Sequence, residues 1–298
     1  MKRLIYILIA GVLLLSSCKI EDGDNFSDDH VVHGYVAFEG VFMAFNKDMG
    51  NVSFVLAVND YIQGDETKRV EMENGVFKDV RISQTAGQWI FDHTYGEDKE
   101  IIRYVIETNG GNLLETGSSW NITKINNADR DKTDSEGKFN IKCTGPDSWE
   151  MNIEWFRYFN WNKEGNNDGY INTAEAVFYI KRTAFTESGG YQRATYNVNG
   201  PAVYTSGEER DFKIESAMSG ANITVFSGDG FYPFARKKTE TATFEITVKN
   251  RNRRTDHITA VVKGYNVSII FNKKKNTYQV PDFTGLPKPP QQKPALQP

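Results

Sequence analysis

Short segments in which apolar and polar residues alternate recur along most of this chain, and they constrain its fold more than any other feature. A period of two places successive side chains on opposite faces, which is the pattern of a half-buried β-strand. Such segments are 52–58, 102–106, 120–123, 139–143, 177–182, 211–216, 222–226, 243–248, 257–262 and 265–271. Turn residues separate them at short intervals. The sequence therefore predicts an all-β fold, as in sandwiches and open barrels.

Two local patterns in the first half sharpen that expectation. Val52, Phe54, Leu56 and Val58 alternate with Ser53, Val55 and Ala57, which predicts a strand. Asn74-Gly75 lies between the strand-like segments 70–73 and 76–80. A type I′ turn needs positive φ at both central residues, and Asn-Gly supplies it. We therefore expect a β-hairpin over residues 70–80.

Between the two halves lies a polar segment, 164–175, with oxygen-bearing side chains at alternate positions. Ca²⁺ needs about six to eight oxygens around one point, and a tightly curled loop supplies them from alternate residues. The segment resembles the EF-hand calcium loop, with Gly169 at the sharp turn. The spacing predicts these ligands: Glu164, Asn166, Asp168, the carbonyl of Tyr170, Asn172 and Glu175. The alternative is a solvated turn, which Asn, Asp and Gly form for reasons of backbone conformation alone.

The predicted organisation has two β-sandwich or open-barrel-like units. Residues 34–148 form the first β domain, 149–176 a connector with the EF-hand-like loop, and 177–280 the second β domain. The run 177–180 favours a strand, so strand–loop–strand and helix–loop–helix arrangements both stay open for the connector. Six of the nine prolines fall in 281–298, which predicts an extended tail without sheet hydrogen bonds.

The N-terminus has the form of a secretory signal. Lys2 and Arg3 precede the apolar run 4–15, which is too short for a membrane span of ~20 residues. The sequence Leu-Leu-Ser-Ser-Cys at 14–18 resembles the lipobox of bacterial lipoproteins. This resemblance implies that residues 1–17 are removed and that Cys18 carries the lipid, including palmitate, that anchors the chain in a membrane. The alternative is an ordinary signal peptide with an incidental cysteine.

The residues after Cys18 indicate a destination. Lys19 at the second position resembles outer-membrane lipoproteins of Gram-negative bacteria. The acidic stretch 19–24 is similar to the export signal of cell-surface lipoproteins of the Bacteroidetes. Together they imply an outer-membrane, cell-surface lipoprotein, with the periplasmic face as the alternative. The rest of 18–33 is polar and acidic, which predicts a tether.

Lipidation of Cys18 leaves Cys143 without a partner cysteine. It shares one face of an alternating segment with Phe139 and Ile141, so we expect a small buried hydrophobe. Basic clusters at 236–238, 251–254 and 273–275 suggest either an anion-binding face or solvated strand ends that discourage edge pairing, and we favour the strand ends. Nucleic acid is not an expected partner outside the cell.

No catalytic motif is present in the chain. It has no Gly-x-Ser-x-Gly elbow, no His-Glu-x-x-His and no P-loop or dinucleotide fingerprint. We therefore expect a non-catalytic module that binds a glycan or a protein, with calcium as a structural ion. Trp155 and Trp161 are the candidate apolar surfaces on which sugar rings would stack. The alternatives are a glycan hydrolase with an unrecognised carboxylate pair and a structural subunit of a surface complex.

Overall fold

The computed structural model describes residues 28–95, 100–126, 135–155, 159–160, 170–171, 173–205, 213–227, 236–249, 255–264, 266–271 and 274–279. Two helices open this part of the chain, α2 (Asp28–Gln63) and α3 (Glu66–Asn74). The strands that follow are β1 (Val80–Thr85), β2 (Gln88–Tyr95), β3 (Glu100–Asn109), β4 (Ser119–Asn126), β5 (Ser135–Gly145), β6 (Ser148–Trp155), β7 (Phe159–Asn160), β8 (Tyr170–Ile171), β9 (Thr173–Ser188), β10 (Tyr191–Thr205), β11 (Lys213–Phe226), β12 (Arg236–Lys249), β13 (Thr255–Lys263), β14 (Asn266–Phe271) and β15 (Lys274–Gln279).

Thirteen of these strands form one antiparallel sheet in the order β1-β2-β3-β4-β5-β6-β9-β10-β11-β12-β13-β14-β15, and β7 pairs with β8. The all-β prediction is confirmed. The expected division into two β units is not, because β6 pairs directly with β9 from Ser148↔Lys181 to Trp155↔Ala174. Residues 149–155 of the expected connector are therefore a strand of the sheet. Buried hydrophobic residues of both halves form one cluster.

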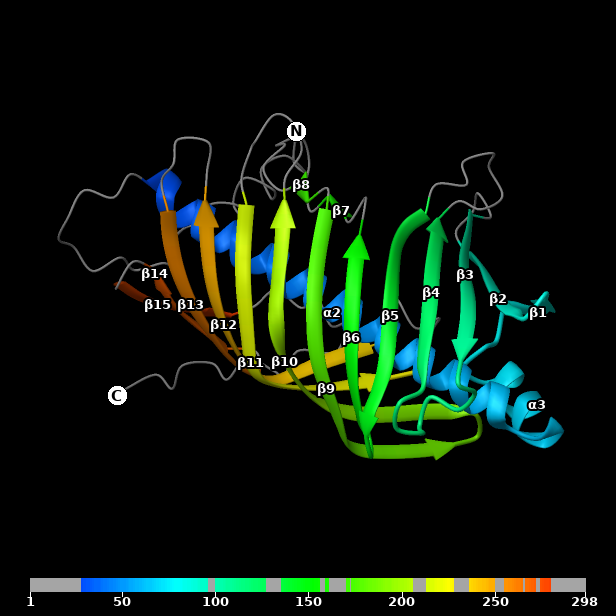
Figure 1. Ribbon diagram of the computed structural model, residues 1–298. Coiled ribbons are helices and arrows are strands. Elements are labelled where there is room, and N and C mark those ends of the chain that lie inside the picture. The colour runs from blue at the N-terminus through cyan, green and yellow to red at the C-terminus, as the bar shows by residue number, and fades with distance from the viewer. Residues whose placement is uncertain are drawn as a thin grey trace, which may run out of the picture.

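The long strands β9 to β12 bend near their middle and fold the sheet around α2 (Figure 1). We call the broad face formed by β1–β6, β13–β15 and the adjoining halves of the long strands the wall. The bent halves that pass beneath the helix, 182–188, 191–198, 220–226 and 236–240, we call the floor. Register shifts in the pairing of β10 and β11 mark the bend. Gly200 permits it, since its φ is 150° and a Cβ there would lie 1.9 Å from the Val177 carbonyl oxygen.

Helix α2 replaces the strand expected at 52–58. All seven residues from Val52 to Val58 are buried, so no face of this segment meets solvent. A helix that is apolar all round is stable only when surrounded, and here wall and floor enclose it. The 36-residue helix is about 54 Å long. It begins at Asp28, so the last part of the expected tether is helical.

The hairpin expected at 70–80 is also wrong. Asp65 caps α3 by accepting a hydrogen bond from the Lys68 N–H, and Gly75 ends the helix with its N–H bonded to the Met72 carbonyl. Gly75 has a φ of −112°, which is not the geometry of a type I′ turn. A Cβ on Gly75 would lie 2.6 Å from the Gly190 carbonyl oxygen, so glycine is required for close packing of α3 on the β9–β10 turn.

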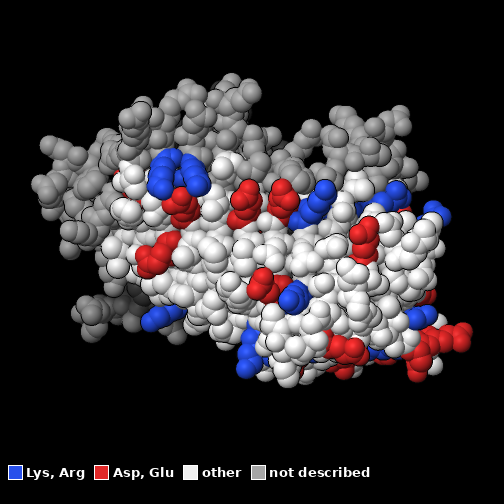
Figure 2. Space-filling view, in the orientation of Figure 1, with Lys and Arg blue, Asp and Glu red and all other residues white. Residues whose placement is uncertain are grey.

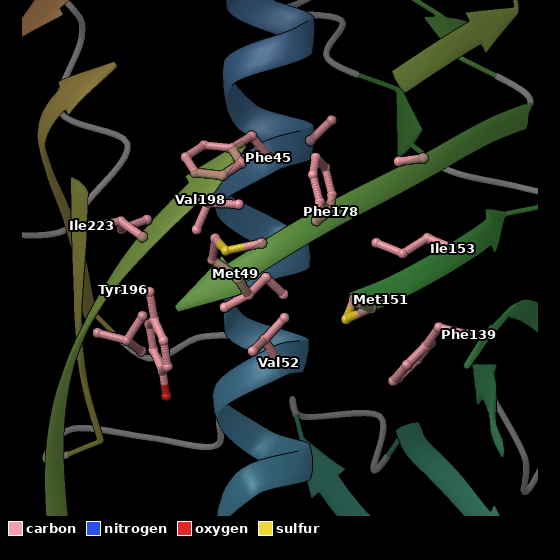
Figure 3. Packing of buried hydrophobic residues seen from close by; sticks show 14 of the residues in the cluster. Phe45, Met49, Val52, Phe139, Met151, Ile153, Phe178, Tyr196, Val198 and Ile223 are labelled. Atoms are coloured by element: carbon pink, nitrogen blue, oxygen red, sulfur yellow. The ribbon is translucent and has the colours of Figure 1, made fainter. Parts of the chain in front are cut away.

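The core lies on both sides of the helix. In Figure 3, Phe45, Met49 and Val52 of α2 lie between two groups of sheet residues. One group comes from the floor and its bend: Tyr196, Val198 and Ile223. The other comes from the wall: Phe139, Met151, Ile153 and Phe178. Cys143 is fully buried, as predicted.

Polar side chains fix the position of α2 within this apolar surround. Asn46, Ser53 and Asp60 recur every seven residues and so lie on one side of the helix. All three bond to the floor: Thr239 Oγ1 donates to Asn46 Oδ1 (3.3 Å), Ser53 Oγ to Tyr196 Oη (3.3 Å), and Gln192 Nε2 to Asp60 Oδ2 (3.1 Å). On the wall side, Tyr104 Oη donates to Asn51 Oδ1 at 2.8 Å. These bonds specify one rotation and one axial position of the helix.

Candidate functional site

A row of asparagine side chains crosses the outer face of the wall. Asn121 of β4 lies opposite Asn140 of β5, which lies opposite Asn152 of β6. Asn140 Nδ2 donates to Asn121 Oδ1 at 2.7 Å. Their strand neighbours Ile122, Ile141 and Ile153 are buried, so the alternation of each strand turns the amides outward.

Tyr179 of β9 stands in the adjoining row. It lies opposite Glu150 of β6 and Asn199 of β10, and its side chain is 54% exposed. Asn199 is held by its neighbours, because its Oδ1 accepts the Gly220 N–H (2.8 Å) and its Nδ2 donates to Asn197 Oδ1 (3.2 Å). The bend in β10 and β11 therefore orders the side chains beside the tyrosine. We call Asn121, Asn140, Asn152, Tyr179, Asn197 and Asn199 the amide–aromatic patch.

The patch has no charged member. Charged residues adjoin it: Glu150 lies opposite Lys142 and Tyr179 and accepts a hydrogen bond from Asn152 Nδ2 at 3.3 Å, and Lys181 lies opposite Asn197. Figure 2 shows acidic and basic side chains scattered over this face with uncharged surface between them. An amide offers donors and an acceptor together, and an exposed tyrosine offers an apolar ring with a polar tip. This combination suits a neutral ligand with many hydroxyl groups.

The predicted metal ligands fall mostly outside the described residues: Glu164, Asn166, Asp168 and Asn172. Tyr170 is described as a backbone position of β8, opposite Asn160. Glu175 is exposed on β9, directly opposite Glu154 on β6, and Glu154 in turn lies opposite Lys138. Among the described residues no three His, Cys, Asp or Glu side chains are grouped to hold a metal.

The other predicted site residues are placed only in part. Trp155 is the last residue of β6, where its backbone pairs with Gly137 and Ala174. Cys18 and Trp161 lie outside the described residues. Trp120 and Trp149 are fully buried, and their indole N–H groups donate to the Gly111 and Leu113 carbonyls at 3.0 Å each. Neither helix in the described ranges is long and apolar enough to cross a membrane.

Three of the ionisable groups with shifted pKa values belong to helix α2 and the floor strands: Asp60, Tyr196 and Lys237. Burial raises the pKa of the Asp60 carboxyl, and the Arg182 charge and the Gln192 hydrogen bond act against it. Burial also raises the pKa of Tyr196 to about 12 and lowers that of Lys237 to about 8. Asp60 and Tyr196 both bond across the helix–floor contact, so we assign them a structural role.

Comparison with known proteins found no matching family model, no matching curated protein and no matching solved structure. The patch was not predicted from the sequence, although each of its residues can be read there. Asn121, Asn140 and Asn152 each alternate with apolar residues, which predicts an outward face. Their alignment in one row depends on the register of three strands, which no local pattern specifies.

Proposed function

We propose that this protein is a lipid-anchored envelope lipoprotein that binds a neutral glycan on the amide–aromatic patch without chemically altering it. The anchor rests on the lipobox-like sequence at Cys18, and the proposed location is the outer membrane facing the cell surface. The observation that carries the binding proposal is the 54% exposed Tyr179 beside rows of outward amides. A sugar ring can stack on the tyrosine while its hydroxyls bond to the asparagines.

Affinity electrophoresis tests the binding proposal. The protein is run in native gels containing xyloglucan, mannan or dextran. We expect one of these polysaccharides to retard the wild type and Tyr179→Ala to lose that retardation. Tyr191→Ala is the matched control, because Tyr191 is 44% exposed at the β9–β10 turn, away from the patch. Equal migration in every gel, or equal retardation of both variants, would contradict the proposal.

One observation favours hydrolysis as a second candidate. Glu154 and Glu175 are directly opposed, and side chains in such a pair have Cβ atoms about 4.5–5.5 Å apart. Retaining glycosidases place two carboxyls at a similar separation of about 5–5.5 Å. Both glutamates are exposed on the open wall rather than enclosed with a substrate, so we favour binding. Release of reducing sugar that Glu175→Gln abolishes would reverse this preference.

We further propose that calcium binds the 164–175 segment as a structural ion. The opposition of Glu175 and Glu154 adds support, since like charges directly opposite in a sheet repel. A cation at Glu175 would relieve that repulsion. The role is stability of the wall rather than chemistry.

The anchor has its own test. Wild-type cells labelled with palmitate should yield a labelled protein in the membrane fraction, and Cys18→Ala should remove both the label and the membrane association. Persistent labelling of the Cys18→Ala chain would contradict the lipoprotein assignment.

A further inference from the structure

The row of asparagines continues across the wall as a longer row of uncharged residues. Asn152 lies opposite Val177 of β9. The β9–β10 register is the same on either side of Val177, which places Pro201 opposite it, and Pro201 lies opposite Ala217 of β11. The strands concerned are neighbours in the order β4-β5-β6-β9-β10-β11 and lie side by side in the wall (Figure 1). We call this row, whose members are all exposed or half-buried, the neutral strip: Asn121, Asn140, Asn152, Val177, Pro201 and Ala217.

Charged residues border most of the neutral strip. Glu107 lies opposite Asn121 at one end, and Glu245 lies opposite Ala217 at the other. The adjoining outward rows hold Tyr179 and these charged residues: Lys138, Lys142, Glu150, Glu154 and Glu175. A ligand that followed β6 would therefore meet a glutamate on either side of the strip. A neutral ligand that follows the strip leaves the bordering charges in water, which avoids the cost of burying them.

The spacing of the strip selects the shape of the ligand. Neighbouring strands lie about 4.8 Å apart, so the strip offers one contact at each such step and is about 24 Å long. The sugars of an extended β-1,4-linked chain advance by a similar distance, and successive sugars therefore meet successive strip residues. An α-1,6-linked chain is flexible and coils, so its sugars do not keep this step. The strip thus favours an extended β-1,4-linked glycan.

The two halves of the strip offer different contacts to such a chain. In the amide half, Asn140 Nδ2 donates to Asn121 Oδ1 at 2.7 Å, which leaves Asn121 Nδ2 as a donor and Asn140 Oδ1 as an acceptor for a ligand. A sugar hydroxyl both donates and accepts, so it suits either atom. In the other half, Val177 and Ala217 offer apolar surface, and Tyr179 stands beside Val177 on the same face of β9. Sugar rings can pack there through their C–H faces.

We propose that the neutral strip binds an extended, neutral β-1,4-linked glycan that lies across the strands, with one sugar residue on each strand. This inference rests on the proposed glycan-binding function, and it adds the linkage class of the glycan and the direction of its chain. One sugar stacks on Tyr179. The sugars that follow it cross β6 and β5 and reach Asn121 of β4.

The first test varies the linkage and the length of the glycan. Isothermal titration calorimetry uses the full chain, in a detergent without a sugar headgroup, and β-1,4-linked manno-, xylo- and cello-oligosaccharides. We expect at least one of these series to bind more tightly as its members lengthen, up to about six residues, where the strip is filled. Isomalto-oligosaccharides, which are α-1,6-linked, should not bind. Binding of the α-1,6 series alone would overturn this inference and leave the proposed function in place, whereas binding of no series would contradict both.

The second test measures the direction of the chain with Asn121→Asp. Asn121 and Tyr179 are three strand spacings apart, about 14 Å, so only a chain that crosses the strands contacts both. The aspartate keeps an oxygen to accept from Asn140 Nδ2, but the strip loses a donor and gains a charge, so the hexasaccharide should bind about tenfold more weakly. The trisaccharide should bind Asn121→Asp as it binds the wild type.

Thr123→Asp is the matched control. Thr123 lies on the same strand but in the adjoining row, opposite Lys138, and this variant should bind the hexasaccharide as the wild type does. If Tyr179→Ala loses the hexasaccharide while Asn121→Asp binds it unchanged, the direction across the strands is overturned and the glycan-binding function stands.

Discussion

The wall and the floor belong to one sheet but hold the helix in different ways. On the wall side the contacts are mainly aromatic: Phe54 packs on Tyr104 and Phe91 with ring centroids 4.3 and 5.7 Å apart. On the floor side, polar bonds from Asn46, Ser53 and Asp60 recur along the helix. Apolar packing supplies most of the stability, whereas buried hydrogen bonds specify one arrangement among many. The wall thus supplies aromatic packing and one of these hydrogen bonds, from Tyr104 to Asn51, whereas the floor supplies the other three.

The largest expected effect comes from breaking the wall contact. Phe54→Ala should lower the free energy of unfolding by about 3–5 kcal/mol, because Phe54 is fully buried and the truncation leaves a cavity beside the rings of Phe77, Phe91 and Tyr104. Urea denaturation measures it. Phe185→Ala is the control; Phe185 is 38% exposed, and its loss should cost far less. Equal losses would mean that the aromatic packing around Phe54 is not a main source of stability.

The same contrast explains which parts of the fold were predictable. Strands such as β3 and β13 alternate strictly between buried and solvent-facing residues, and the period of two found them. Helix α2 has no solvent face at 52–58, so the order of apolar and polar residues in this segment could not distinguish a helix from a strand. The sheet that surrounds the segment decides its conformation. At Asn74-Gly75 the nearby cap signal of Asp65 outweighed the turn signal. The bend of β9 to β12 and the alignment of the patch depend on the pairing register between strands, which no local sequence pattern specifies.

Calcium should stabilise the wall if the central segment binds it. A ligand at 100 times its dissociation constant adds about 2.7 kcal/mol, and extracellular sites bind at roughly 10⁻⁴ to 10⁻³ M. The melting temperature should therefore rise in millimolar CaCl₂ relative to EGTA. Glu175→Ala should remove the shift, and Glu115→Ala, a control outside the segment, should keep it. No shift in the wild type would identify the segment as a polar turn.

On the floor side, Asp60 should make stability depend on pH. Its folded pKa is raised by burial above that of the unfolded chain, so the folded state holds the proton more tightly. The stabilisation is fully present below the unfolded pKa, near 3.9, and is lost as pH rises through the folded pKa. Asp60→Asn should remove this component of the pH dependence. The free energy of unfolding of the wild type and of the variant is measured at several pH values. Identical pH profiles would contradict a contribution from Asp60.

The smallest effect expected is the coupling between Ser53 and Tyr196. Ser53→Ala leaves the buried Tyr196 hydroxyl without this donor, which should cost about 1–3 kcal/mol. Tyr196→Phe on the Ser53→Ala background removes the stranded hydroxyl as well, and replacing both partners of a buried bond can be nearly neutral. A double-mutant cycle should therefore show coupling of about 0.5–1.5 kcal/mol. Additive losses would mean that this bond does not hold the helix to the floor.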